Sequence, residues 1–208
     1  MATFVRILPC LLICTASHAD APAVSASPNI VSASKDGGAR DFVPIPPTTT
    51  QVASPNGRYA FIVHSSDAWQ SKRATGRLLK NTSAGQELEW ERVLPQEYGP
   101  RYFLVGNQGQ TVLFDEWINV KSRYAVVLIH HQKNLEVSHD FEAVAKILGV
   151  PVAAITARAK HGWWIEGIPS LDSTGTSAIV ATAGKCLVID LNTGLLSLAG
   201  SPPPNCRP

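Results

Sequence analysis

Asp115, Glu116 and Trp117 form the local group of this sequence that is best suited to chemistry. A carboxylate can act as a general acid or base, and a tryptophan ring can stack on a sugar or a protein side chain. If residues 110–118 form a strand, Asp115 and Trp117 share one face and Glu116 points to the other. Two carboxylates on opposite faces cannot flank one scissile bond, so these two alone predict no glycosidase pair. Asp115 is therefore a candidate catalytic residue only with a partner elsewhere, such as Glu166 or Asp172, and its alternative role is to bond a turn at a strand end.

Tryptophan is abundant for a chain of this size, with five residues. Trp117 lies beside Asp115, and Trp163 and Trp164 are adjacent, so these rings could form a platform for a sugar or a hot spot for a protein. Alternatively, they fill the space between sheets. Neighbours in a strand point to opposite faces, so at least one of Trp163 and Trp164 should be partly exposed. The candidate binding surface is Asp115, Trp117, Trp163 and Trp164.

The histidines predict no metal site. A zinc or copper site needs several ligands that converge, and His130 and His131 point to opposite sides of a strand. No HExxH helix occurs, and His64, His139 and His161 are scattered along the chain. We therefore predict no metal ligand and no cofactor. No Gly-x-Ser-x-Gly motif supports nucleophilic catalysis either.

Short β-type runs separated by turn residues position these side chains. Polar turns that contain glycine, such as Ser54-Pro55-Asn56-Gly57, open successive groups of strands. One helix is predicted over 141–148, because Asp140 can cap it, its apolar residues recur at helical spacing, and Gly149 and Pro151 follow. A further short helix over 152–161 is an additional expectation. The predicted strands cover 58–64, 77–80, 86–92, 101–105, 110–118, 123–131, 135–138, 163–166, 176–182, 186–191 and 195–199.

This pattern predicts a mainly β fold with about three antiparallel meander units. The phrases SPNGRYAFIV, VGNQGQTVLFDEW and LDSTGTSAIVATAGKCLVIDLNTG resemble the blade phrases of exported bacterial β-propeller-like proteins, many of unknown function. The resemblance covers most of residues 52–199 and implies structure but no activity. A closed propeller usually has four or more blades. Three units therefore predict an open stack, a β-sandwich, or chains that associate.

The first residues read as a cleavable signal peptide, residues 1–19. Arg6 supplies the positive charge, residues 7–13 the apolar run, and Ser17-His18-Ala19 the cleavage site. Residues 20–50, rich in Pro, Ser, Thr and Ala, form a predicted disordered linker before a β domain at 51–199. The sequence thus indicates an exported protein, periplasmic or secreted.

Cleavage of the predicted signal peptide would remove Cys10 and Cys14. Cys186 and Cys206 would then be the one cysteine pair of the mature chain. An oxidising compartment favours a disulfide between them. It would tie the Pro-rich tail, residues 200–208, back to a strand and contribute roughly 3 kcal/mol to stability.

Charge excludes some partners. Loss of Arg6 leaves 17 basic and 16 acidic residues, one basic residue fewer than the 18 of the full chain. Such a balance gives no footprint for nucleic acid and no polybasic membrane patch. We predict a non-catalytic exported module that binds a protein or glycan. The alternatives are a cell-envelope hydrolase or lyase that uses Asp115 with a histidine, and a structural subunit completed by self-association as a homo-oligomer.

Overall fold

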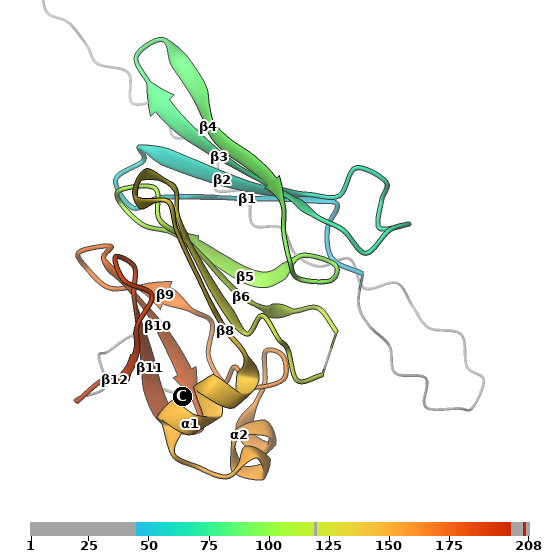
Figure 1. The fold of residues 1–208 in the computed structure, drawn as a ribbon, viewed down its shortest axis with the longest axis vertical. Helices are drawn as coiled ribbons and strands as arrows, with labels where there is room; N and C mark the ends of the chain where they lie inside the picture. Colours follow the sequence, from blue (N-terminus) through green and yellow to red (C-terminus); the bar gives the residue numbers. More distant parts are fainter. Residues whose placement is uncertain (1–44, 119, 201–205, 207–208) are drawn as a thin grey trace, which may run out of the picture. The chain divides into compact units, whose positions relative to one another are not determined.

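The computed structural model describes residues 45–118, 120–200 and 206, which belong to the compact unit Gly38–Pro208. The predicted signal peptide, most of the predicted linker and most of the predicted tail lie outside these residues. The described chain forms three four-stranded antiparallel sheets, and in each sheet the strands lie side by side in chain order (Figure 1).

The three sheets are named A, B and C in chain order. Sheet A contains β1 (Thr49–Ala53), β2 (Tyr59–His64), β3 (Thr75–Thr82) and β4 (Gly85–Val93). Sheet B contains β5 (Pro100–Val105), β6 (Thr111–Glu116), β7 (Val126–His130) and β8 (Leu135–His139), with a 3-10 turn at His131–Lys133. Sheet C contains β9 (Ser170–Leu171), β10 (Ser177–Thr182), β11 (Lys185–Asp190) and β12 (Leu196–Leu198). The predicted mainly β chain of about three antiparallel meanders is confirmed.

Two helices separate sheets B and C in the sequence (Figure 1). Helix α1 spans Phe141–Leu148, as the sequence predicts. The Asp140 side chain accepts a hydrogen bond from the Ala143 amide, and Gly149 ends the helix with a φ of 62°. Helix α2 spans Val152–Arg158, so the expected second helix is also present but shorter. In the part of the chain that the structure describes, no helix is both long and apolar enough to cross a membrane.

Sheet B supplies the centre of the core, because its inner strands β6 and β7 are buried on both faces. Phe61 and Leu78 of sheet A pack with Leu113 and Val127 of sheet B in one hydrophobic cluster. A second cluster joins the other face of sheet B to α1, α2 and sheet C. These two clusters thus join sheet B to its neighbours on either face, and a third, smaller cluster lies on the far side of sheet C, so no described cluster joins sheet A to sheet C.

The first turns of the three sheets are connected by hydrogen bonds. Asn56 donates from its backbone N–H to Oδ1 of Asn107 at 3.0 Å and from Nδ2 to the Asn107 carbonyl at 2.9 Å. Asn107 donates from Nδ2 to the Thr174 carbonyl at 2.9 Å. Residues that are 51 and 67 positions apart therefore form one ladder of side-chain and backbone bonds. The ladder holds the equivalent turns of sheets A, B and C in register.

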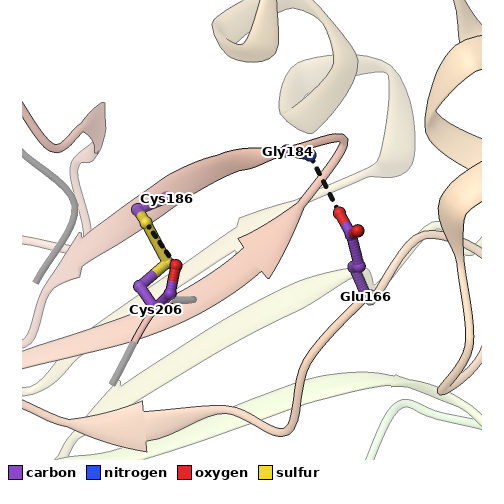
Figure 2. Close-up of a disulfide and its surroundings, with 4 residues drawn as sticks. All are labelled: Glu166, Gly184, Cys186 and Cys206. Carbon is purple, nitrogen blue, oxygen red and sulfur yellow. Dashed lines mark hydrogen bonds between the residues drawn. A yellow bond between two sulfur atoms is a disulfide. The ribbon is translucent and has the colours of Figure 1, made fainter. Parts of the chain in front are cut away.

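The outer face of sheet C is covered by the disulfide between Cys186 and Cys206 (Figure 2). Both cysteines are buried with Ile179 and Ala181 of β10. The predicted pairing is confirmed, and it brings the end of the chain onto a strand face that would otherwise expose apolar side chains.

A predicted strand over residues 163–166 is wrong. These residues form a bent segment between α2 and β9. The amides of Lys160 and His161 both donate to the Ile165 carbonyl at 3.0 Å, which closes a turn where a strand would run straight. The apolar run from Trp163 to Ile165 has the composition of a strand, but this local bonding prevents strand pairing.

Candidate functional site

Asp115 is buried at the end of β6, with no exposed side-chain surface. Its φ is +56°, in the left-handed region that few residues other than glycine adopt, although aspartate tolerates it better than most. The Asp115 amide donates to the Ala125 carbonyl at 2.9 Å, after the paired part of β6 and β7. The left-handed backbone at Asp115 thus sets the direction of its carboxyl group at the end of β6.

The Asp115 carboxyl group has few partners for a buried acid. Its Oδ2 accepts a hydrogen bond from the Trp163 amide at 3.2 Å and lies 4.0 Å from Nε of Arg101. Its Oδ1 is buried without a hydrogen-bond partner. An unpartnered buried carboxylate oxygen costs free energy, because burial removes the water that would otherwise bond to it.

Burial raises the pKa of Asp115 from 3.8 to about 6. The backbone N–H groups of Glu116, which is the next residue, and of Trp163 act in the opposite direction together with the Arg101 guanidinium, and the nearby Glu116 carboxylate adds to the rise. The loss of hydration outweighs these donors. A carboxyl group with this pKa exchanges its proton close to neutral pH, as binding and catalytic carboxyl groups often do.

Arg101 connects Asp115 to the surface. Its side chain is 13% exposed and donates to the carbonyl oxygens of Glu116 at 3.2 Å and Trp117 at 2.9 Å. The guanidinium also lies over the Trp117 ring, 5.1 Å from its centroid. Trp117 is held in addition by a bond from its Nε1 to the Pro100 carbonyl at 3.1 Å. An arginine and a half-buried indole are thus fixed together above the carboxyl group.

The segment between α2 and β9 covers the other side of Asp115. Gly162 has a φ of +126°, and a Cβ atom at this position would lie 2.6 Å from Oδ2 of Asp115 and 2.9 Å from Nε of Arg101. Only glycine fits this close approach. The His161 ring meets Tyr102 of β5 edge-on, with 6.3 Å between the ring centroids. Arg101, Tyr102, Trp117, His161 and Trp163 are all half-buried around the carboxyl group, and with Asp115 they form what we name the Asp115 cluster.

The structure brings three of the four predicted binding residues together. Asp115 and Trp117 belong to the Asp115 cluster by their side chains, whereas Trp163 joins it through its backbone amide and its ring packs on Phe141 of α1, with 6.4 Å between the ring centroids. Trp164 lies wholly inside the core between sheets B and C, where its carbonyl accepts a bond from Thr182. Trp163 is partly exposed and Trp164 is not, as predicted, but the two residues lie in a bent segment and do not follow the alternation of a strand.

The other carboxylates considered as partners have structural contacts. Glu116 accepts a hydrogen bond from the Ser122 hydroxyl at 2.7 Å. Glu166 accepts from Arg158 through both carboxylate oxygens and from the Gly184 amide at 2.8 Å, so it secures the turn between β10 and β11 (Figure 2). Asp172 accepts bonds from Thr174 and Thr176 within its own turn.

The histidines lie apart from one another. His64 bonds to Thr49 on sheet A, and His139 bonds to the Gly194 carbonyl near sheet C. His130 is buried on β7 with neither ring nitrogen bonded, and its burial lowers its pKa. Among the described residues, no group of three or more His, Cys, Asp or Glu side chains is arranged to hold a metal ion.

A shallow depression of about 530 Å³ lies between the β2–β3 and β4–β5 loops. Lys72 and Glu97, which line it, form an ion pair at 3.0 Å. These two charges therefore neutralise each other, and Oε1 of Gln96, which also lines the depression, is buried without a hydrogen-bond partner.

Sequence reasoning missed Arg101, Tyr102 and Gly162. Arg101 precedes Asp115 by fourteen residues. It reaches the carboxyl group because β5 and β6 form an antiparallel pair, in which Pro100 is opposite Glu116 and Tyr102 is opposite Phe114. The turn at residues 106–109 predicts an antiparallel pair of strands on either side of it. In that pair, residue 101 lies beside residue 115.

Comparison with known proteins gives little further information. No protein-family model matches the chain, and no curated protein matches it. Among solved structures, a europium-containing methanol dehydrogenase is similar with 12% sequence identity and a TM-score of 0.34. The match covers 72% of this chain and 24% of that chain.

Proposed function

We propose that this chain is an exported, non-catalytic module that binds a protein or glycan ligand at the Asp115 cluster. The observation that carries the proposal is the burial of Asp115 with Oδ1 unpartnered, directly beneath an arginine stacked on a half-buried tryptophan. A buried acid and a left-handed backbone both cost stability. Departures of this kind from stable local structure concentrate at functional sites.

The surroundings of the carboxyl group support a binding role. Arg101 and Trp117 are residue types that contribute strongly to binding surfaces, and both are held rigidly by hydrogen bonds to backbone carbonyls. Rigid side chains lose little conformational entropy when a ligand binds. The site therefore needs little reorganisation of these two groups.

We also propose that the chain is exported and that it is related to the exported blade-repeat proteins that its sequence resembles. The two end sheets support an open stack of three meanders. On the outer face of sheet A, Arg77 pairs with Glu91 at 2.8 Å and Thr49 bonds to His64. The outer face of sheet C carries the disulfide. Polar or covered outer faces are typical of terminal repeats in a stack, although Leu88 and Val93 of β4 are exposed, at 52% and 59%.

One observation favours an enzyme as the second candidate. A carboxyl group with a pKa of about 6 suits a general acid near neutral pH. This hypothesis predicts turnover of a cell-envelope polymer by the purified protein and its loss in Asp115→Asn. Turnover that survives this substitution would remove Asp115 from the chemistry.

The main proposal is tested by capture. The full chain is expressed in its own host, recovered from the exported fraction and immobilised, and retained proteins and glycans are identified by mass spectrometry. Arg101→Ala and Trp117→Ala should lose the ligand. Arg92→Ala is the matched control, because Arg92 is stacked on Trp90 of sheet A in the same way, 5.2 Å from the ring centroid.

Circular dichroism establishes that each variant is folded. Equal retention of every ligand by wild type, Arg101→Ala and Trp117→Ala would exclude the Asp115 cluster as the binding site. If neither wild type nor any variant retains a ligand, the proposal that the chain is a binding module is contradicted.

A further inference from the structure

Resting on the function proposed above, we propose that the ligand is an uncharged glycan whose hydroxyl groups bond to Asp115 and Arg101 and whose sugar ring stacks on Trp117. This inference chooses between the two ligand classes that a binding module leaves open. It depends on charge, on unmet hydrogen-bonding groups and on the shape of the exposed ring.

The charges of the Asp115 cluster disfavour an ionic ligand group. Oδ2 of Asp115 lies 4.0 Å from Nε of Arg101, so a negative and a positive group share one small site. A carboxylate or phosphate that approached Arg101 would be repelled by Asp115, and an ammonium group that approached Asp115 would be repelled by Arg101. An uncharged ligand avoids both penalties.

The unmet hydrogen-bonding groups of the cluster match hydroxyl groups. Oδ1 of Asp115 is a buried acceptor without a donor. Arg101 bonds through Nε and Nη2, and a guanidinium carries five N–H donors. A hydroxyl group both donates and accepts. Neighbouring hydroxyls of one sugar could therefore bond to the carboxylate and the guanidinium together.

Trp117 offers a fixed surface for the apolar face of a sugar. Its Nε1 bonds to the Pro100 carbonyl, and the Arg101 guanidinium lies over the ring. The remaining half-buried part of the ring is a rigid apolar surface next to polar groups. A pyranose ring likewise combines apolar faces, which carry C–H groups, with a polar rim of hydroxyl groups.

The Asp115 side chain is fully buried, so a ligand can reach its carboxyl group only if a covering segment moves, and the segment that contains Gly162 lies against Oδ2. This segment is a closed turn, because Lys160 and His161 both bond to the Ile165 carbonyl. Its amide bond to the carboxyl group comes from Trp163, at 3.2 Å. Movement of this segment to admit a sugar hydroxyl would break this bond to Oδ2, so glycan binding should change the hydrogen exchange of the Trp163 amide.

The experiment uses the full chain and a panel of uncharged pentasaccharides, namely cellopentaose, maltopentaose, xylopentaose, mannopentaose and chitopentaose. Binding is measured by isothermal titration and by tryptophan fluorescence. We expect saturable binding of at least one sugar, about tenfold weaker affinity in Asp115→Asn and Trp117→Ala, and no change in Arg92→Ala. Hydrogen exchange of the Trp163 amide should change on binding in wild type.

The results separate this inference from the function on which it rests. If no pentasaccharide binds, but an identified protein or charged polymer binds and is lost in Trp117→Ala, the glycan inference is overturned and the binding module stands. If a pentasaccharide binds equally to wild type, Asp115→Asn and Trp117→Ala, the location of the site is overturned for both. Asp115→Asn should be at least as stable as wild type, so weaker binding by this variant could not be attributed to unfolding.

Discussion

The Trp163 amide donates to Oδ2 of Asp115 at 3.2 Å, across 48 positions of the sequence. This bond connects the bent segment after α2 to the end of β6. It is also one of the few contacts that the buried carboxyl group makes, because Oδ1 has no partner. The free-energy cost of this arrangement can be measured.

Asp115→Asn should stabilise the protein at pH 7. The pKa of Asp115 is raised from 3.8 to about 6, so the folded state binds a proton more tightly than the unfolded state does. The resulting stabilisation is fully present below about pH 4 and is lost as the pH rises through about 6. Ionisation of the buried group should then cost on the order of 3 kcal/mol at pH 7. Asparagine tolerates the left-handed backbone and carries no charge.

Urea unfolding at pH values from 4 to 7 measures this effect as the difference between Asp115→Asn and wild type. The lowered pKa of His130 also changes stability with pH, in the opposite direction, but His130 is present in both proteins and cancels in the difference. A difference that does not change with pH would contradict the assigned ionisation of Asp115.

Glu166→Gln should destabilise the protein at pH 7, which makes it the matched control with the opposite sign. Bonds from Arg158, and then the Gly184 amide, lower the pKa of Glu166 despite its burial. The stabilisation is present above the unfolded pKa of 4.5 and is lost as the pH falls through the lowered folded value. The cost should be about 1.5 kcal/mol, the lower end of the range for hydrogen bonds to charged groups, because the Arg158 side chain is 49% exposed.

The measurement is urea unfolding of wild type and Glu166→Gln at pH 7 and pH 3. The difference in stability between the two proteins should be larger at pH 7 than at pH 3. Equal stability at pH 7 would show that the carboxylate contributes nothing to the turn between β10 and β11.

Local sequence signals predicted α1 and the first turn of each sheet. Asp140 caps α1 and Gly149 ends it, and both signals act within the helix and its flanks. The glycines at 57, 109 and 175 adopt positive φ values in the three first turns, as polar turns with glycine predict. These features depend on residues close to one another in the chain.

The Asp115 cluster was predicted only in part, because its contacts are between distant segments. Alternation along a strand placed Asp115 and Trp117 on one face, but it could not predict the left-handed backbone at Asp115. Strand-like composition suggested a strand at Trp163, where two amides share the Ile165 carbonyl and form a turn. The position of Trp164 in the core depends on how α2 and sheet C pack, which the sequence pattern does not specify.

Replacement of both Cys186 and Cys206 by alanine should destabilise the protein by roughly 3 kcal/mol, in the loop-entropy account of a cross-link between residues 20 apart. The disulfide also covers Ile179 and Ala181. Urea unfolding of wild type with and without reductant should reproduce most of the loss, and reductant should leave the double variant unchanged. Identical stability of oxidised wild type and the double variant would contradict this role.

Gly57→Ala and Gly175→Ala should differ in cost, although both glycines occupy equivalent turns. The φ values are +68° and +69°, so each alanine meets the same backbone penalty of about 1 kcal/mol. A Cβ atom at residue 57 meets nothing within 4 Å, whereas one at residue 175 would lie 2.5 Å from Nδ2 of Asn107. Gly175→Ala should therefore also break the bond from Asn107 to the Thr174 carbonyl. Thermal unfolding should give a lower Tm for Gly175→Ala, and equal values would mean that the ladder between sheets B and C contributes no stability.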